Sequence, residues 1–401
     1  MIQRRGFRYR LYPTPAQEAR LRAWEGALRA LWNVAHEQRR LYLARGDRPP
    51  SVFDQINQLT ELRAEVPWLA EVPRNVCAQV LVELDAAWQR CFTRLARRPR
   101  WKKKGRDPVA ITEPHPRVFR VTPGSVAFPK LGTIRAILHR PLVGEPKRCT
   151  IAREVDQWFV SIQCEQEVPE REQRPGPVVA IDRGVTNLPG DSDGRLVPNP
   201  KHLDASLRRL AHAQRVVARR TKGSRRRARA RLRVAKLHRT IRRQRAHVLH
   251  VLSARYAKSH GVAIVERLHV AGMLRGGLGR HISGAGWASF CAMLRYKLEA
   301  TGGRLVEVPA PYSSQTCSAC GVVDAASRQS DRFRCVACGH EAHADLNAAR
   351  VLLSRGNLGD AGRGGFRAVS GPVKRQLRVV RRGHSTVQVP GLLKSPGRQS
   401  G

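Results

Sequence analysis

The chain has 401 residues, of which 74 are Lys or Arg and 31 are Asp or Glu, and its formal net charge is +43. Because so large an excess cannot be neutralised within the molecule, we expect a polyanionic partner, with nucleic acid the leading candidate. Hydrophobic residues make up 41% of the sequence, which excludes a wholly disordered chain. No stretch has the character of a signal peptide or a membrane-spanning helix, so we expect a protein of a bacterial-type cytoplasm, associated with the nucleoid.

The first hundred residues predict one strand followed by helices. Residues 5–12 alternate basic and apolar side chains, which indicates a strand with one face toward a core and a cationic outer face. Residues 14–17 have the form of a capping box with Pro at the first helical position, and apolar residues follow at helical spacing to about residue 46. Further helices are predicted at about 52–64 and 74–96.

A basic segment and a β-rich segment follow. Residues 97–106 place seven cations around Trp101, which predicts a linker or a loop that contacts phosphates. Its candidate nucleic-acid contacts are Lys102, Lys103 and Lys104. From 110 to 167, short β-rich runs are separated by Pro and Gly, and they predict a small antiparallel barrel or sheet that the strand at 5–12 could join.

Two fully apolar runs predict buried strands, and each ends on an acid. Residues 178–181 lead to Asp182, and residues 262–265 lead to Glu266. A third acid, Asp345, opens a segment typical of a helix start. Each acid alone has a simple structural explanation, as a surface or capping residue. If the three converge, they repel one another unless Mg²⁺ or Mn²⁺ compensates their charge, and such ions can promote phosphodiester cleavage.

The segment 207–245 contains 17 Lys or Arg and no acid. An apolar stripe at helical spacing predicts two helices here, broken at 222–224. A charged helix is normally a solvated face, but no acid within the segment can balance this charge, which favours contact with phosphates. The candidate contacts are Arg225, Arg226, Arg227 and Arg229. Residues 355–401 are rich in Gly and cations and are predicted to form a disordered basic tail.

Four of the nine cysteines form two C-x-x-C pairs, separated by 14 residues and each followed by Gly. This spacing is typical of a zinc ribbon, a closed site that adds folding energy and performs no chemistry. The ligands would be Cys317, Cys320, Cys335 and Cys338. Since four thiolates complete a tetrahedron, His340 and His343 are interpreted as surface histidines. The five other cysteines are predicted to be mostly small core residues.

Four strings of the sequence carry a resemblance to a known family. They are Ala180-Ile-Asp-Arg-Gly-Val-Thr-Asn187, Ile264-Val-Glu-Arg-Leu-His-Val-Ala-Gly-Met273, Ser314-Gln-Thr-Cys-Ser-Ala-Cys-Gly321 and Ala344-Asp-Leu-Asn-Ala-Ala349. In this order they resemble the motifs of the TnpB family, also called OrfB, which are nucleases encoded by insertion sequences and related to type V CRISPR effectors. Segments 7–15 and 101–105 are similar too, so the resemblance extends to about residue 355.

The resemblance implies an RNA-guided DNA endonuclease with guide RNA and target DNA as partners. It also implies an α/β multidomain fold in which Asp182, Glu266 and Asp345 hold catalytic Mg²⁺ or Mn²⁺ and the four cysteines hold structural zinc. The implied parts are a β wedge-like domain (1–14 and 107–170), a helical recognition domain (15–106), a ribonuclease-H-like (RuvC) nuclease domain (177–310 and 341–354), an inserted zinc ribbon (311–340) and the basic tail.

Four positions depart from the usual pattern of that family. Pro189 falls in what is usually an uninterrupted strand after the first acid, and Pro removes a donor from a β-ladder. Arg267 and His269 replace Asp and Asn, which are common after the second acid, and Gly284 replaces a common Asp.

Three other functions remain open at the level of sequence. One is a guide-directed DNA-binding protein of the same fold with weak or no cleavage, which the presence of all three acids disfavours. Another is a guide-independent transposase that joins DNA strands. A general RNA-binding zinc protein is the weakest alternative, because it leaves the acids at the strand ends without a role.

Overall fold

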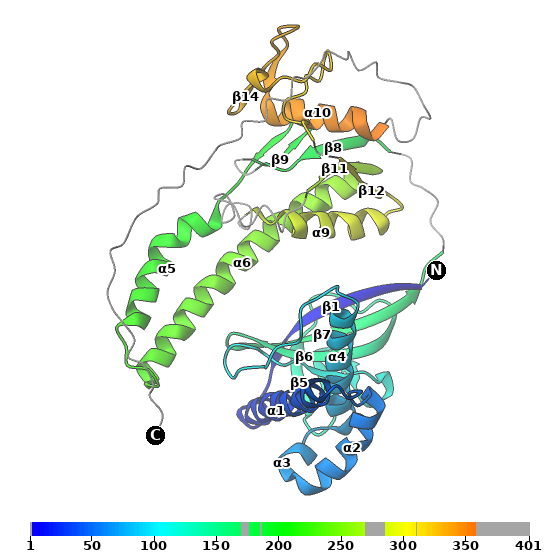
Figure 1. Cartoon of the computed structure of the whole chain (residues 1–401), viewed down its shortest axis with the longest axis vertical. Coiled ribbons are helices and arrows are strands. Elements are labelled where there is room, and N and C mark those ends of the chain that lie inside the picture. Colours follow the sequence, from blue (N-terminus) through cyan, green and yellow to red (C-terminus); the bar gives the residue numbers. More distant parts are fainter. Residues whose placement is uncertain (1, 170–175, 185–186, 269–284, 310, 358–401) are drawn as a thin grey trace, which may run out of the picture. The chain divides into compact units, whose positions relative to one another are not determined.

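The computed structural model describes residues 2–169, 176–184, 187–268, 285–309 and 311–357 (Figure 1). The predicted basic tail lies outside the described residues, except for its first three residues, which complete a helix. His269 and Gly284 also lie outside them. Within the described ranges, no helix combines the length and the apolar composition that crossing a membrane requires.

Seven antiparallel strands from the first part of the chain form one sheet. They are β1 (Ile2–Tyr12), β2 (Ile111–Glu113), β3 (Arg120–Thr122), β4 (Ser125–Phe128), β5 (Gly132–Ile137), β6 (Glu145–Glu154) and β7 (Gln157–Glu167), in the order β2-β6-β7-β1-β5-β4-β3. In β1, Phe7, Tyr9 and Leu11 are buried while Arg8 is exposed, as the alternation predicted. Because β1 pairs with β5 and β7, the prediction that the N-terminal strand joins this sheet is confirmed.

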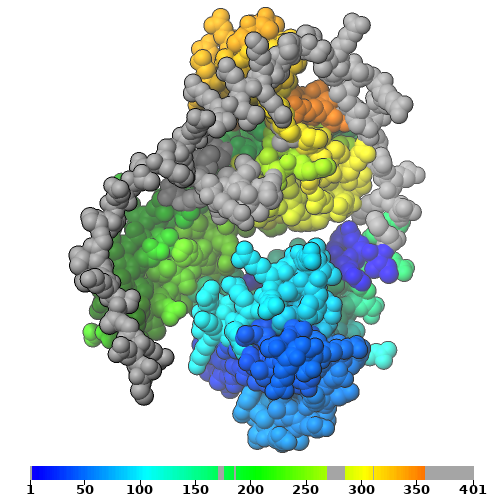
Figure 2. All heavy atoms as spheres, in the orientation of Figure 1, coloured from blue at the N-terminus to red at the C-terminus, as the bar shows by residue number. Residues whose placement is uncertain are grey.

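Helices pack against this sheet and share its core (Figure 2, blue against cyan). They are α1 (Pro15–Arg45), α2 (Val52–Glu65), α3 (Pro67–Ala70) and α4 (Arg74–Phe92), and a 3₁₀ turn lies at Pro116–Val118. The predicted capping box opens α1, because the Thr14 side chain accepts the N–H of Gln17 and the Gln17 side chain accepts the N–H of Thr14. The helix predicted at 74–96 is shorter than expected, because Arg94 adopts a left-handed conformation and turns the chain.

A second sheet has five strands in the order β10-β9-β8-β11-β12. Their bounds are β8 (Val178–Asp182), β9 (Asn187–Asp191), β10 (Leu196–Pro198), β11 (Val262–Arg267) and β12 (Arg304–Pro309). The strands β8, β11 and β12 run parallel, whereas β9 is antiparallel to β8. The two apolar runs are therefore buried strands, as predicted.

The expectation that Pro189 interrupts the strand after the first acid is wrong, because β9 runs through it. Gly190 and Asp191 pair with β8, and the register with β10 shifts between Gly190 and Asn187. Pro189 falls at this irregularity, and irregular positions are where strands accommodate Pro.

Helices cover both faces of the second sheet (Figure 1). The helices of this region are α5 (His202–Ala218), α6 (Arg225–Ser259), α9 (Trp287–Glu299) and α10 (Ala344–Asn357). Side chains of α6 and α9 pack with Val179 and Val265, and Leu352 of α10 packs with Ala180 and Ile264 on the other face. The predicted break at 222–224 is confirmed, with α5 and α6 on either side of it.

Three short strands form a small sheet in the region of the two cysteine pairs. They are β13 (Arg328–Gln329), β14 (Arg332–Arg334) and β15 (Glu341–His343), preceded by a 3₁₀ turn at Ala325–Ser327. Phe333 of β14 is fully buried against Cys317, Cys335 and Ala344. The small core between this sheet and the start of α10 is thus built partly from the cysteines themselves.

Candidate active site and metal centre

The structure brings the three predicted acids to one edge of the five-stranded sheet. Asp182 is the last residue of β8, and Glu266 lies near the end of β11. Ile181 and Val265 are register partners in this parallel pair, so the two acids that follow them are neighbours. Asp345 comes from α10, which packs on β8 and β9. The helix begins one residue before Asp345, so this acid lies in its first turn and the N-cap interpretation is wrong.

Two glycines give Asp345 the space to approach the sheet. A Cβ at Gly190 would lie 2.8 Å from the Cβ of Asp345, closer than such atoms come in proteins. A Cβ at Gly184 would lie 3.4 Å from the Asp345 Oδ2 and 2.7 Å from the carbonyl oxygen of Asn187. The glycine beside Pro189 therefore has a defined role: it lets α10 carry the third acid close to the other two.

The electrostatics of the site show that the acids influence one another. Burial and the negative charges of Glu266 and Asp345 raise the pKa of Asp182 to about 8, against an opposing effect of Arg328. A carboxyl with so high a pKa marks a place where negative charge is in excess and where a cation would be stabilised.

Neutral and cationic side chains orient two of the acids. Ser313 donates its hydroxyl to the Glu266 Oε1 at 2.9 Å. Asn187 donates its amide to the Asp345 Oδ2 at 3.0 Å, and the Arg328 guanidinium lies 3.6 Å from the Asp345 Oδ1. The sequence reasoning missed these three residues. Asn187 could have been found because it ends the first family motif (180–187), and Ser313 because it directly precedes the third motif (314–321).

Arg183 ties together the strand ends that carry the acids. Its buried guanidinium donates to the backbone carbonyl of Glu266 and to the Cys291 Sγ of α9, the latter at 2.9 Å. Next along the chain, the Gly184 carbonyl accepts the indole N–H of Trp287, also on α9, at 3.1 Å. These bonds fix β8, β11 and α9 to one another just behind Asp182.

The two C-x-x-C pairs form one compact cluster. The four Sγ atoms lie within 4.8 Å of one another, and among the described residues no other group of three or more potential metal ligands is so close. The Sγ atoms of Cys317 and Cys338 are 3.8 Å apart, and those of Cys320 and Cys335 are 3.6 Å apart. Tetrahedral zinc with bonds of about 2.3 Å requires sulfur separations of about 3.8 Å. Backbone N–H groups of Cys338 and Ala337 lower the pKa of Cys335 to about 6, which favours the thiolate.

The cysteine cluster is joined to the helix that carries Asp345. Asn347 of α10 accepts the N–H of Ser318 at 2.9 Å and donates to the carbonyl of Thr316 at 2.7 Å. Arg328, which reaches Asp345, also comes from this region. Asn347 and Arg328 thus connect the cluster to the helix of the third acid.

The two histidines near the cluster are half-buried, and neither belongs to the group of potential metal ligands. The His340 Nε2 lies 3.5 Å from the Ser318 Oγ, and the His343 Nδ1 accepts the N–H of Asp345 at 3.2 Å. They support the backbone beside the cluster and the third acid. The prediction for the remaining cysteines is confirmed, since four are buried and one is half-buried: Cys77, Cys149, Cys164, Cys291 and Cys91.

The basic segment 97–106 is docked onto α1. The Lys102 ammonium lies 4.0 Å from the centre of the Trp32 ring, and burial lowers the pKa of this lysine. The backbone N–H of Lys102 donates to the Asn33 side chain, whose amide in turn donates to the Lys102 carbonyl. Lys103 and Lys104 are exposed. The structure thus gives Lys102 an anchoring position and leaves the other two open to solvent.

The arginines at the start of α6 also differ from one another in exposure to solvent. Arg225, Arg226 and Arg229 are exposed, whereas Arg227 is half-buried and donates to the carbonyl of Arg220 at 2.7 Å. Further along α6, Glu154 at the end of β6 and Asp156 in the turn that follows balance part of the charge. These ion pairs join Glu154 to Arg242 and Arg243, and Asp156 to Lys236 and Arg239.

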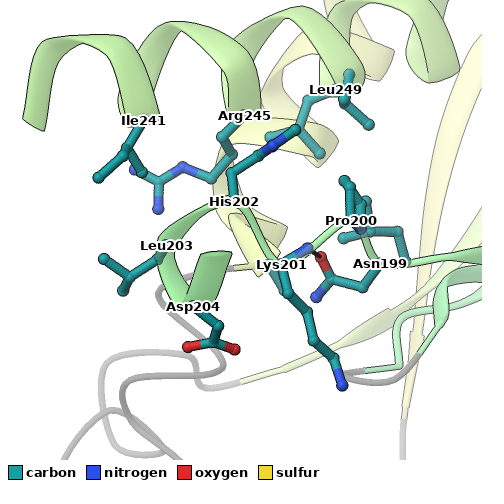
Figure 3. Close-up of a pocket in the computed structure, with 12 residues that line it drawn as sticks. Asn199, Pro200, Lys201, His202, Leu203, Asp204, Ile241, Arg245 and Leu249 are labelled. Atoms are coloured by element: carbon teal, nitrogen blue, oxygen red, sulfur yellow. Dashed lines mark hydrogen bonds between the residues drawn. The ribbon is translucent and has the colours of Figure 1, made fainter. Parts of the chain in front are cut away.

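A separate small cavity lies where the turn before α5 meets α6 (Figure 3). Its lining includes Lys201, His202, Arg245 and Leu249, and its volume is about 30 Å³. That is room for little more than a water molecule. None of the three acids lines it, and we assign it no role in the chemistry.

Comparison with known proteins places the chain in a family. Residues 161–276 match the OrfB family of IS605 elements, described as "Probable transposase", residues 287–352 match a "Cas12f1-like, TNB domain", and residues 1–47 match the "Helix-turn-helix domain" of the OrfB proteins. In this structure residues 1–47, which match the helix-turn-helix model, contain the strand β1 and the helix α1.

Full-length relatives agree with these matches. A protein of Streptomyces pristinaespiralis, named as a proposed RNA-guided DNA endonuclease, is 34% identical over 91% of this chain and 92% of its own length. InsQ of Escherichia coli K12, named in the same way, is 29% identical over 89% of this chain and 93% of its own. The chain therefore belongs to the OrfB family of insertion-sequence proteins, also called TnpB.

The fold has a relative among solved structures. The Cas12f1 protein in a complex with guide RNA and target DNA superposes with a TM-score of 0.53 at 10% identity, covering 88% of this chain and 98% of that one. At this level of identity the likeness concerns the fold alone. It agrees with the sequence-based expectation of a fold related to type V CRISPR effectors.

Proposed function

We propose that this chain is an RNA-guided DNA endonuclease that hydrolyses phosphodiesters with divalent metal ions held by Asp182, Glu266 and Asp345. The observation that carries this proposal is that three carboxylates lie near one sheet edge, where the charges of Glu266 and Asp345 act on Asp182, in a chain of net charge +43. The names of its full-length relatives support the activity and its partners, guide RNA and target DNA.

The arrangement of the second sheet supports a RuvC-like, that is ribonuclease-H-like, nuclease domain. Its strands mix parallel and antiparallel neighbours, two of its acids end parallel strands, and the third comes from a helix on one face. We propose that this domain comprises 177–310 and 341–354, with a zinc ribbon inserted at 311–340. The seven-stranded sheet and the N-terminal helices would then be the wedge-like and recognition domains, at 1–14 with 107–170 and at 15–106.

The residues of the acid site fit Mg²⁺ or Mn²⁺, because all three offer hard carboxylate oxygens and their mutual repulsion calls for a cation. When bound, such ions stabilise the attacking and leaving oxygens of the phosphodiester. The chain's own groups fix the geometry: Ser313 and Asn187 hold two carboxylates by hydrogen bonds, and Arg328 adds a positive charge beside Asp345.

We expect the stabilising effect of Mg²⁺ to grow with pH. The unfolded chain loses the Asp182 proton near its usual pKa of about 3.9, whereas the folded, metal-free protein keeps it up to a pKa of about 8. Because the folded state then binds more protons, the free energy of unfolding of the metal-free protein falls as pH rises between these values. Above pH 8 the carboxylate is free to bind metal without displacing a proton.

Thermal unfolding with and without Mg²⁺ at pH 6, 7 and 8.5 measures this effect, and the rise in Tm caused by Mg²⁺ should be largest at pH 8.5. The control is Asp182→Asn, which keeps the shape but has no proton to lose and should remove the trend. An equal rise in Tm at all three pH values in the wild type would contradict the proposed metal site.

We also propose that exposed arginines of α6 follow the nucleic-acid backbone. An RNA–DNA heteroduplex is recognised by its shape and its phosphates rather than by its sequence. Arg225, Arg226 and Arg229 are exposed and therefore available for such contacts, whereas Arg227 already donates to a backbone carbonyl.

Replacing these three exposed arginines with Gln should flatten the salt dependence of RNA binding. Each phosphate contact contributes about 0.7 to 0.9 to the log–log slope, so three lost contacts should reduce it by about 2 to 3. Affinity measured between 50 and 300 mM NaCl gives the slope. Arg227→Gln is the matched control and should leave it unchanged; a wild-type slope in the triple variant would show that α6 is not a contact surface.

A further inference from the structure

Tyr312 has an exposed ring on a backbone that disfavours it. It lies between β12 and the first cysteine pair, 65% of its surface is exposed, and its φ is +60°. The left-handed region accommodates Gly and, less readily, Asn, and it is unfavourable for a bulky side chain. Neither core packing nor backbone preference explains an aromatic residue at this position.

The surrounding bonds hold this conformation firmly. The carbonyl of Tyr312 accepts three donors, the N–H groups of Gln315 and Thr316 at 3.0 Å each and the hydroxyl of Thr316 at 2.7 Å. Arg355 of α10 donates to the carbonyls of Pro309 and Pro311 at 3.1 and 3.0 Å. The loop is therefore fixed on both sides of Tyr312, and a strained residue held in this way commonly marks a functional position.

Tyr312 directly precedes a residue that contacts the proposed active site. Ser313 is buried and donates to the Glu266 carboxylate at 2.9 Å. Consecutive Cα atoms are about 3.8 Å apart. The exposed ring thus belongs to the residue next to a direct partner of an acid in the proposed active site.

We propose that Tyr312 is a substrate-positioning residue whose ring stacks on a base of the DNA strand beside the scissile phosphate. This inference rests on the proposed function. An endonuclease whose target is read by a guide needs contacts at the cut that accept any base. Aromatic stacking provides such contacts, because every base offers a flat face. Arg328 can attract the phosphates, whereas the ring would fix which nucleotide lies at the acids.

The test compares wild type with Tyr312→Phe, Tyr312→Leu and Tyr312→Gly, each loaded with the RNA that copurifies with the protein and given matched DNA and Mg²⁺. Phe keeps the stacking face and should cleave within about twofold of wild type. Leu and Gly should lose about 5- to 150-fold in cleavage rate, the value of one base–aromatic stack. Gly should also raise Tm, because it relieves the unfavourable backbone. Zinc content and Tm show that each variant is folded.

A second measurement separates stacking from a structural role. DNA with 2-aminopurine at successive positions around the cut is bound in Ca²⁺, and the fluorescence of a stacked position should be quenched in wild type and Tyr312→Phe but not in Tyr312→Leu. Wild-type cleavage by Tyr312→Leu, or identical fluorescence in wild type and Leu at every position, would overturn the inference while leaving the proposed function intact. Absence of guided cleavage in the wild type would instead remove the proposed function, and this role with it.

Discussion

Asp182→Ala, Glu266→Ala and Asp345→Ala should each abolish DNA cleavage while leaving guide-dependent DNA binding largely intact. The three carboxylates lie near one sheet edge, where burial and the charges of Glu266 and Asp345 raise the pKa of Asp182. Removing one takes away a metal ligand, and metal stabilisation of the transition state is worth several kcal/mol, so we expect a loss of about a thousandfold or more. Binding should persist because the guide and the basic surfaces supply it.

Single-turnover cleavage and filter binding on the same preparations measure both quantities. Asp182→Asn and Glu266→Gln repeat the test without a change of shape. Glu307→Gln is the matched control: Glu307 lies on β12 opposite Val265, one strand from Glu266, and its carboxylate pairs with Arg295. It should cleave like wild type. Metal-dependent nicking by Asp182→Ala at the wild-type rate would remove the assignment of the acids.

Cys317→Ser or Cys335→Ser should abolish zinc binding at the proposed four-cysteine site and remove most of the stability of the region around it. Structural zinc sites in small peptides contribute an apparent free energy of about 10–16 kcal/mol at pH 7, and the described core of this region consists largely of Phe333 and the cysteines. Cleavage should fall with stability, because Asn347 and Arg328 link the region to the helix of Asp345.

Metal analysis should find about one zinc per chain in the wild type and almost none in these variants. Thermal unfolding and limited proteolysis should show a lower Tm and cleavage within 311–343. Cys91→Ser, which changes a half-buried cysteine far from the cluster in sequence, should keep both zinc and Tm. A metal-free protein that melts like wild type would show that the cluster is not a structural metal site.

Local sequence patterns predicted the elements that carry the acids. The apolar runs at 178–181 and 262–265 are buried strands, as their length and composition predicted, and their ends place Asp182 and Glu266 on neighbouring strands. The capping box at the start of α1 and the C-x-x-C spacing were equally informative, since in each the interacting residues are only three positions apart. Sequence patterns that involve only neighbouring residues were therefore sufficient to predict these elements.

Contacts between distant segments could not be predicted in this way. Because of Pro189, an interrupted strand was expected after the first acid, yet β9 passes through this residue at a register shift. The adjacent Gly190 leaves room for Asp345. Lys102 belongs to a run of exposed cations in sequence, but Trp32 provides a ring for its ammonium. Arg183 is a surface-type residue that becomes buried because a backbone carbonyl and Cys291 accept its donors. Each depends on a partner many residues away.

Plasmid cleavage in the presence of Mg²⁺ tests the central claim most directly. The protein is purified without RNA and then incubated with a plasmid carrying one target, in three parallel reactions that contain a matched guide RNA, a mismatched guide RNA or no RNA. We predict a cut at the target only with the matched guide, and none with Asp182→Ala. Equal cutting in all three reactions would contradict RNA guidance and indicate a guide-independent nuclease or transposase, and guide-dependent binding without any cut would indicate a DNA-binding protein of the same fold.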